Sequence, residues 1–226
     1  MSPGRIALAA AVAALLSLER KAFLQAMLAR PLVACPILGA VLGHPAEGVL
    51  LGAALELFFL GTTNLGAAMP DHELLAAVVA VGCTAALREG GWSPAASMLL
   101  GALVGLPAAK FGRAAERASE QFNAQLETGA YEEPLRLLRR NLRGLWLPAS
   151  AAAVALLAGV ALGLLLRRAI VPAPGSLRAL GWGWLGFEVA AAAIAVRAVR
   201  SVRAGLIGGV AAVAAASAQA LGHLAP

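Results

Sequence analysis

The sequence has few charged residues and few of the groups that carry covalent chemistry. Asp, Glu, Lys and Arg make up 13% of its 226 residues, against about 25% in a soluble domain. It contains no phosphate-cradling glycine loop followed by Lys-Ser/Thr, no Cys/His metal cluster and no nucleophile elbow. Its two cysteines, Cys35 and Cys83, lie in apolar runs and predict neither a disulfide framework nor a metal site. We therefore expect no cofactor, no metal and no phosphoryl chemistry on this chain.

Hydrophobic residues fill most of the chain instead. They account for 60% of the sequence, which predicts an all-α, polytopic integral membrane protein with one membrane-embedded domain over residues 1–226. At about 20 residues per span, the length allows six to eight membrane segments. The net charge of +6 comes largely from arginines between apolar runs. Membrane orientation explains this excess better than binding to nucleic acid does.

Residues 30–71 form an apolar stretch that is interrupted by polar groups. Glu56 lies among leucine, phenylalanine and alanine, and Asn64 follows in a polar patch bracketed by Gly61 and Gly66. The two glycines and a following proline disfavour an unbroken helix. We predict a helix that ends near Gly61, followed by a turn that lines a wet cavity, so that broken or re-entrant helices surround a central polar site.

The polar groups of this stretch suit a hydroxyl-rich ligand. A carboxylate at membrane depth costs roughly 2.5–3.5 kcal/mol and normally faces the bundle interior. Glu56 accepts through two oxygens, Asn64 both donates and accepts, and Thr63 adds a hydroxyl. A sugar would fit such a set. The structural alternative, in which a protonated Glu56 packs against a neighbouring helix and Asn64 caps a helix end, stays open on physical grounds alone.

The stretch also resembles a known family, the enzyme IIC membrane subunit of the mannose/fructose/sorbose-family phosphotransferase system. The resemblance is firm over residues 18–91 and rests on Arg30-Pro31-Leu32, then Glu56-x-x-x-Leu60-Gly61-x-x-Asn64-x-Gly66-Ala67-Ala68, then Pro70-Asp71. It implies a hexose-translocating permease subunit in the bacterial inner membrane. It also implies an enzyme IID partner in a higher oligomer of IIC–IID pairs, and cytoplasmic IIA and IIB proteins that phosphorylate the sugar.

The resemblance also suggests which residues form the site. Glu56 and Asn64 are the main candidates for sugar binding, with Thr63 and Asp71 beside them, whereas Arg30, Pro31, Gly61 and Gly66 are structural parts of the motif. Glu19, Phe23 and Gln25 fill the places of the acid, Phe and Gln that precede the Arg-Pro pair in the family. Their spacing departs from the commonest one, so Glu19 and Gln25 have an equal alternative as ordinary interfacial residues.

The first part of the chain predicts short helices. Residues 6–18 are apolar, and because no convincing small-x-small cleavage site precedes Glu19, we expect a retained helix rather than a signal peptide. The apolar runs 31–43 and 48–61 predict a tilted pair or a re-entrant hairpin, in which glycine pairs such as Gly48 and Gly52 allow close helix contact. A helix over 73–88 follows. Capping by Asp71 is favoured over proton chemistry of an Asp-His pair.

The second part predicts longer elements. Residues 93–111 return across the membrane, and basic residues place the amphipathic segment of about 111–143 in the cytoplasm, against lipid headgroups or a phosphoryl-carrying protein. The C-terminal helices cover 145–224, and the first of them, 145–166, is expected to break early at Pro148. A non-transporting membrane scaffold or regulatory protein derived from IIC, which docks phosphotransferase partners, is the alternative function.

Overall fold

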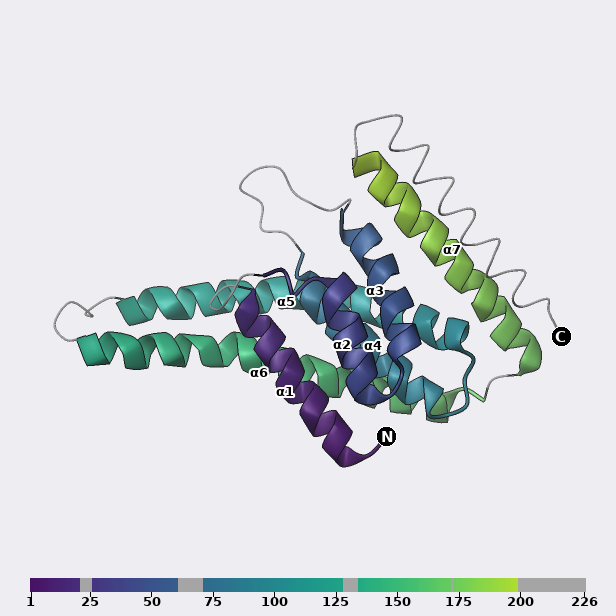
Figure 1. Cartoon of the computed structure of the whole chain (residues 1–226), viewed down its shortest axis with the longest axis horizontal. Helices are drawn as coiled ribbons and strands as arrows, with labels where there is room; N and C mark the ends of the chain where they lie inside the picture. The colour runs from purple at the N-terminus through teal and green to yellow at the C-terminus, as the bar shows by residue number, and fades with distance from the viewer. Residues whose placement is uncertain (21–25, 61–70, 128–133, 172, 199–226) are drawn as a thin grey trace.

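The chain is all-helical in a computed structural model that describes residues 1–20, 26–60, 71–127, 134–171 and 173–198. Seven α-helices and no strands occupy this part of the chain, which confirms the predicted all-α class (Figure 1). The helices are α1 (Pro3–Glu19), α2 (Pro31–Leu42), α3 (Pro45–Leu60), α4 (Glu73–Arg88), α5 (Pro94–Glu127), α6 (Pro134–Ala169) and α7 (Pro174–Ala198).

Six of these seven helices begin with a proline. Proline suits the first helical position because its fixed φ is already helical and its missing N–H would have no partner there. Helix α4 is the exception. Its N-cap is His72, whose Nδ1 accepts from the backbone N–H of Leu75 at 3.3 Å. The expected cap at Asp71 is wrong: the Asp71 carboxylate accepts instead from the guanidinium of Arg113 on α5.

Helices α2 and α3 form the predicted hairpin. Helix α2 ends at Leu42 and is capped by Gly43, whose φ of +92° is left-handed and favours glycine. The two helices contact each other through their backbones: a Cβ on Gly48 would lie 2.5 Å from the carbonyl oxygen of Cys35, and one on Gly52 would lie 2.6 Å from that of Pro31. The glycine spacing therefore does predict a close helix contact.

Helix α4 lies at the centre of the molecule. All of its residues from Leu74 to Leu87 are buried, and it packs against α2, α3, α5 and α6. Glycines again allow the close contacts. A Cβ on Gly105 of α5 would lie 2.5 Å from the Ala76 carbonyl oxygen, and a Cβ on Gly163 of α6 would lie 2.6 Å from the Cys83 carbonyl oxygen. Packing of this kind holds helices together where no hydrophobic effect does.

Helices α5 and α6 are longer than the sequence suggested. The predicted span 93–111 and the first half of the amphipathic segment form one helix, and the second half continues into the span that follows. The expected break at Pro148 is wrong, because α6 runs through it. Packing of α6 against α1, α4 and α5 outweighs the roughly 3 kcal/mol that an interior proline costs. Residues 111–127 and 134–144 project together from the body, and we call them the arm (Figure 1).

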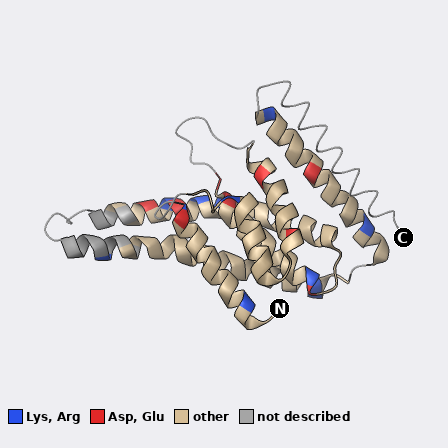
Figure 2. Ribbon diagram, viewed as in Figure 1, with Lys and Arg blue, Asp and Glu red and all other residues tan. Residues whose placement is uncertain are grey.

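The protein is a multi-pass membrane protein, but only some of its described helices are long enough to cross a membrane. Segments of α5 (Pro94–Phe122), α6 (Gly144–Ala169) and α7 are long and apolar enough to cross a membrane. Three such helices, rather than six to eight, occur in the part of the chain that is described, because α1 to α4 have only 12 to 17 residues each against the ~20 that a span needs. Most of the helical body carries neither acidic nor basic side chains (Figure 2).

Candidate functional site

Three charged side chains meet where α2 and α4 begin and α3 approaches its end. Nη1 of Arg30, the N-cap residue of α2, lies 3.2 Å from Oε1 of Glu56 on α3 and 3.3 Å from Oε2 of Glu73 on α4. The second oxygen of Glu56, Oε2, accepts from the backbone N–H of Leu32 at 3.3 Å. We call Arg30, Glu56 and Glu73 the Arg30 cluster. One guanidinium nitrogen therefore serves two carboxylates from different helices.

The Arg30 cluster is only partly shielded from its surroundings. The side chains of Arg30, Glu56 and Glu73 are 33%, 14% and 22% exposed. Two carboxylates beside one guanidinium supply acceptors next to donors, which suits ligand hydroxyls. Glu73 was not identified from the sequence, where it is an ordinary acid in the first turn of a helix. Its meeting with Arg30 joins residues that are 43 positions apart.

Glu19 lies at the end of α1 and holds the turn that precedes Arg30. Its side chain is 4% exposed, and its Oε2 accepts from the backbone N–H of Ala29 at 2.9 Å. Its other oxygen, Oε1, has no hydrogen-bond partner among the described residues. A buried carboxylate oxygen without a partner is costly. Glu19 thus contacts the backbone of the residue that precedes Arg30, and it keeps an oxygen available.

The other predicted site residues divide into two groups. Asn64, Thr63, Gln25, Gly61 and Gly66 lie outside the described residues. Of the rest, Pro31 is the first residue of α2 and is buried, and Asp71 is paired with Arg113 on α5. The predicted end of the helix near Gly61 also lies outside the described residues, because α3 is described as far as Leu60. The structure therefore brings Arg30 and Glu56 together with the unpredicted Glu73, and it places Glu19 against the turn beside them.

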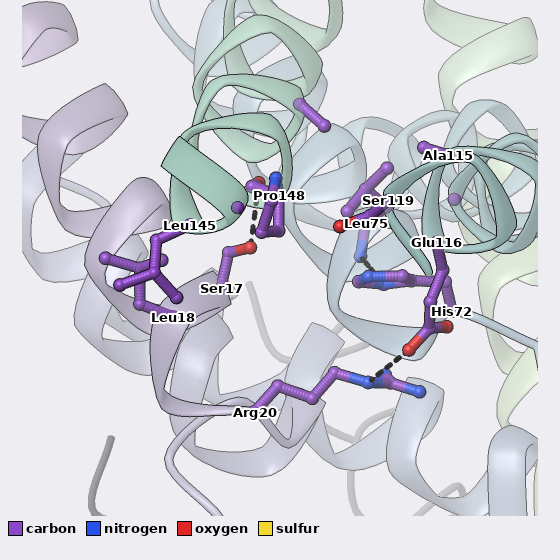
Figure 3. Close-up of a pocket in the computed structure, with 13 residues that line it drawn as sticks. Ser17, Leu18, Arg20, His72, Leu75, Ala115, Glu116, Ser119, Leu145 and Pro148 are labelled. Atoms are coloured by element: carbon purple, nitrogen blue, oxygen red, sulfur yellow. Dashed lines mark hydrogen bonds and ion pairs between the residues drawn. The ribbon is translucent and has the colours of Figure 1, made fainter. Parts of the chain in front are cut away.

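A separate cavity of about 80 Å³ lies between α1, α4, α5 and α6, at the base of the arm (Figure 3). Its polar lining comes from Ser17, Arg20, His72, Glu116 and Ser119. Across it, the Nε of Arg20 lies 3.7 Å from Oε1 of Glu116, and the Ser17 hydroxyl donates to the carbonyl oxygen of Pro148 at 2.8 Å. Small-molecule pockets usually measure about 300–1,000 Å³. This cavity has room for only a few water molecules, and none of the described residues predicted to bind sugar lines it.

Two solved structures share the fold of this chain. A solved structure described as "Structure of membrane protein" aligns with 99% of this chain and 92% of its own, at a TM-score of 0.67 and 21% identity. A complex of the mannose transporter ManYZ with microcin E492 aligns with 96% of this chain and 87% of its own, at 0.61 and 21%. At these identities the likeness establishes the fold alone: an all-α, polytopic membrane protein.

Sequence similarity identifies the family of this chain. The family described as the PTS system sorbose-specific IIC component matches residues 4–125, more than half of the chain, and the chain belongs to it. The sorbose-specific EIIC component of Lacticaseibacillus casei is 48% identical over 50 residues, which are 22% of this chain and 18% of that protein. The sorbose-specific EIIC component of Klebsiella pneumoniae is 38% identical over 84 residues, 37% of this chain and 29% of that protein.

A third relative, the mannose-specific EIIC component of Escherichia coli strain K12, is 42% identical over 50 residues, which are 22% of this chain and 19% of that protein. In each case the aligned segment spans less than a third of the relative's length. The chain is thus a mannose/sorbose-family IIC membrane component by its family, as the motif around Arg30 and Glu56 predicted.

Proposed function

We propose that this chain is the sugar-translocating subunit of a phosphoenolpyruvate-dependent phosphotransferase system. It binds a hexose and passes it inward, where a separate IIB protein phosphorylates it. Family membership over residues 4–125 supports this proposal. The observation that carries it within the structure is Glu56, a partly exposed carboxylate on an apolar helix, in contact with a cation and a backbone N–H.

The chemistry of the Arg30 cluster suits hydroxyl groups. Oε1 of Glu56 contacts Nη1 of Arg30, and Oε2 accepts from the backbone N–H of Leu32, while a carboxylate oxygen accepts more than one hydrogen bond. Arg30 has five N–H donors, and its two contacts to carboxylates both use Nη1. A sugar hydroxyl donates and accepts at once, so neighbouring hydroxyls match a carboxylate beside a guanidinium. Asn64, Thr63 and Gln25, with Asp71 and Glu19, complete the proposed hexose site.

The proposal includes partners and a location. The chain acts in the bacterial inner membrane beside an enzyme IID subunit, within a higher oligomer of IIC–IID pairs. Cytoplasmic IIA and IIB proteins carry the phosphoryl chemistry, so this chain is a permease subunit and no enzyme. The arm contacts lipid headgroups on the cytoplasmic side. We expect the chain to be unstable when it is purified alone and stable when it is co-expressed with IID, as judged by size-exclusion chromatography; a stable chain that ignores IID contradicts this.

Substitution of Glu56 tests the sugar site. Glu56→Gln removes charge-assisted bonds to hydroxyls worth about 1.5–3 kcal/mol, so hexose affinity should fall by roughly one to two orders of magnitude. Calorimetry measures the hexose affinity, on IIC–IID complexes that are assembled to the same extent. Glu47→Gln is the control, because Glu47 lies on the same helix and pairs with Arg88 away from the cluster. Equal affinity of wild type and Glu56→Gln contradicts the site.

The non-transporting scaffold has one observation in its favour. Both oxygens of Glu56 already contact protein groups, as they would if this carboxylate served only to fix the start of α2. A scaffold predicts that cells expressing the chain with its partners accumulate no sugar phosphate, although IIA and IIB proteins still copurify with it. Transport predicts accumulation that depends on Glu56.

A further inference from the structure

We propose that Glu73 is a positioning residue of the proposed sugar site. By binding the same nitrogen of Arg30 as Glu56 does, it keeps this guanidinium from closing onto the Glu56 carboxylate. The inference rests on the proposed function. It concerns a residue on α4 that the family motif around Arg30 and Glu56 does not include.

The geometry shows a shared cation rather than a closed pair. Nη1 of Arg30 lies almost equally far from both carboxylates, 3.2 Å from Oε1 of Glu56 and 3.3 Å from Oε2 of Glu73. An arginine that faces a single carboxylate commonly forms two parallel hydrogen bonds to it, which occupy both oxygens. Here Nη1 of Arg30 contacts Oε1 of Glu56 and Oε2 of Glu73, whereas Oε2 of Glu56 accepts from the backbone N–H of Leu32. Glu73 supplies the competing charge that holds the guanidinium between them.

The shared arrangement affects how easily Glu56 binds a ligand. If Arg30 had Glu56 as its sole partner, ligand hydroxyls would have to compete with a partly buried ion pair, and breaking such a pair leaves an uncompensated charge. With Glu73 in place, Arg30 keeps an anionic partner when Glu56 turns toward a ligand. Glu73 therefore lowers the free-energy cost of freeing Glu56, although it need not touch the ligand.

The seam between α3 and α4 provides a matched control at its other end. There the Nε of Arg88 lies 2.6 Å from Oε1 of Glu47, and Nη1 of Arg88 donates to the carbonyl oxygen of Trp92. This pair also joins α3 to α4, and its side chains are 27% and 11% exposed. Glu47→Gln therefore removes an ion pair from the same seam without altering the Arg30 cluster.

Hexose binding by the IIC–IID complex tests the proposal. Wild type, Glu73→Gln, Glu73→Asp and Glu47→Gln are compared by calorimetry with mannose, fructose and sorbose, and thermal unfolding of each complex is recorded. Glu73→Gln should weaken binding about tenfold, equivalent to the loss of roughly one hydrogen bond to a charged group. Glu73→Asp should restore most of the affinity, and Glu47→Gln should lower the unfolding temperature without changing affinity. Unchanged affinity in Glu73→Gln, or equal losses in Glu73→Gln and Glu47→Gln, overturns the proposal.

A measurement without sugar separates this proposal from the proposed function. Thermal unfolding of Arg30→Gln, Glu56→Gln and the double variant gives the coupling between Arg30 and Glu56. The coupling should increase when the cycle is repeated in the Glu73→Gln background, because Arg30 then pairs with Glu56 alone. If no hexose binds wild type and the coupling still increases, the proposed function fails and the positioning of Arg30 by Glu73 stands. If hexose binds and the coupling does not change, the positioning role fails.

Discussion

The helix ends have different surroundings in the two halves of the described chain, α1 to α4 and α5 to α7. Helices α1 to α4 are short, and side chains contact the backbone near two of their ends. Glu56 accepts from the N–H of Leu32, and Glu19 accepts from that of Ala29. Helices α5 to α7 have 25 to 36 residues and extend beyond the packed body (Figure 1). Backbone N–H groups at helix ends need partners, so polar side chains of the first half stabilise the fold even without a ligand.

The contact between α4 and α5, which joins the two halves, should be the part of the fold most sensitive to an increase in side-chain volume. Gly105→Ala places a methyl group 2.5 Å from the Ala76 carbonyl oxygen, and overpacking should destabilise the fold by about 2 kcal/mol. Gly181→Ala on α7 is the control, because the nearest described atom to its new methyl group is the Ala95 Cβ at 3.9 Å, and alanine favours a helix. Thermal unfolding in detergent measures both variants. A Gly105→Ala variant as stable as wild type would show that α4 and α5 separate easily.

Polar side chains should matter more in the first half than in the second. Glu19→Ala leaves the buried N–H of Ala29 without its acceptor, which should cost about 1–3 kcal/mol. Arg168→Ala removes a charge from an exposed position at the end of α6 and should change stability by less than about 0.5 kcal/mol. The same unfolding assay compares them. Equal effects would remove the difference between the halves.

The arm should lie on the cytoplasmic side, as its basic residues predict. Cysteines placed at Phe122 and Leu142, which are 41% and 58% exposed, should react with an impermeant thiol reagent only after cell lysis. Both native cysteines are buried and give little background. Ser119, although it lies in the same segment, is 8% exposed and suits labelling poorly. Labelling of intact cells would reverse the orientation of the long helices.

Local signals in the sequence predicted most of the elements. The apolar runs 31–43 and 48–61 predicted the α2–α3 hairpin, and the glycine pair Gly48 and Gly52 predicted its close contact. The errors concern contacts between distant residues. Asp71 looked like a helix cap because nothing nearby in the sequence shows that Arg113 binds it instead. The break expected at Pro148 depended on packing that the local sequence does not contain.

The candidate site shows the same limit. Glu56 was identified because a carboxylate in an apolar helix is unusual, and Arg30 because it belongs to the family motif. That the two form an ion pair depends on how α2 packs against α3. Glu73 carries no local signal beyond its place in the first turn of α4. A third member of the cluster becomes visible only when three helices are placed together.

The burial of α4 has a consequence for how the bilayer acts on this protein. A membrane that becomes thinner or thicker acts on helices that contact lipid, which respond by tilting or by deforming the bilayer. Helix α4 is buried along its length and enclosed by α2, α3, α5 and α6. Hydrophobic mismatch therefore acts mainly on α5, α6 and α7, whose apolar segments match a membrane in length. The helix that carries Glu73 is insulated from lipid composition, and its depth is set by the protein around it.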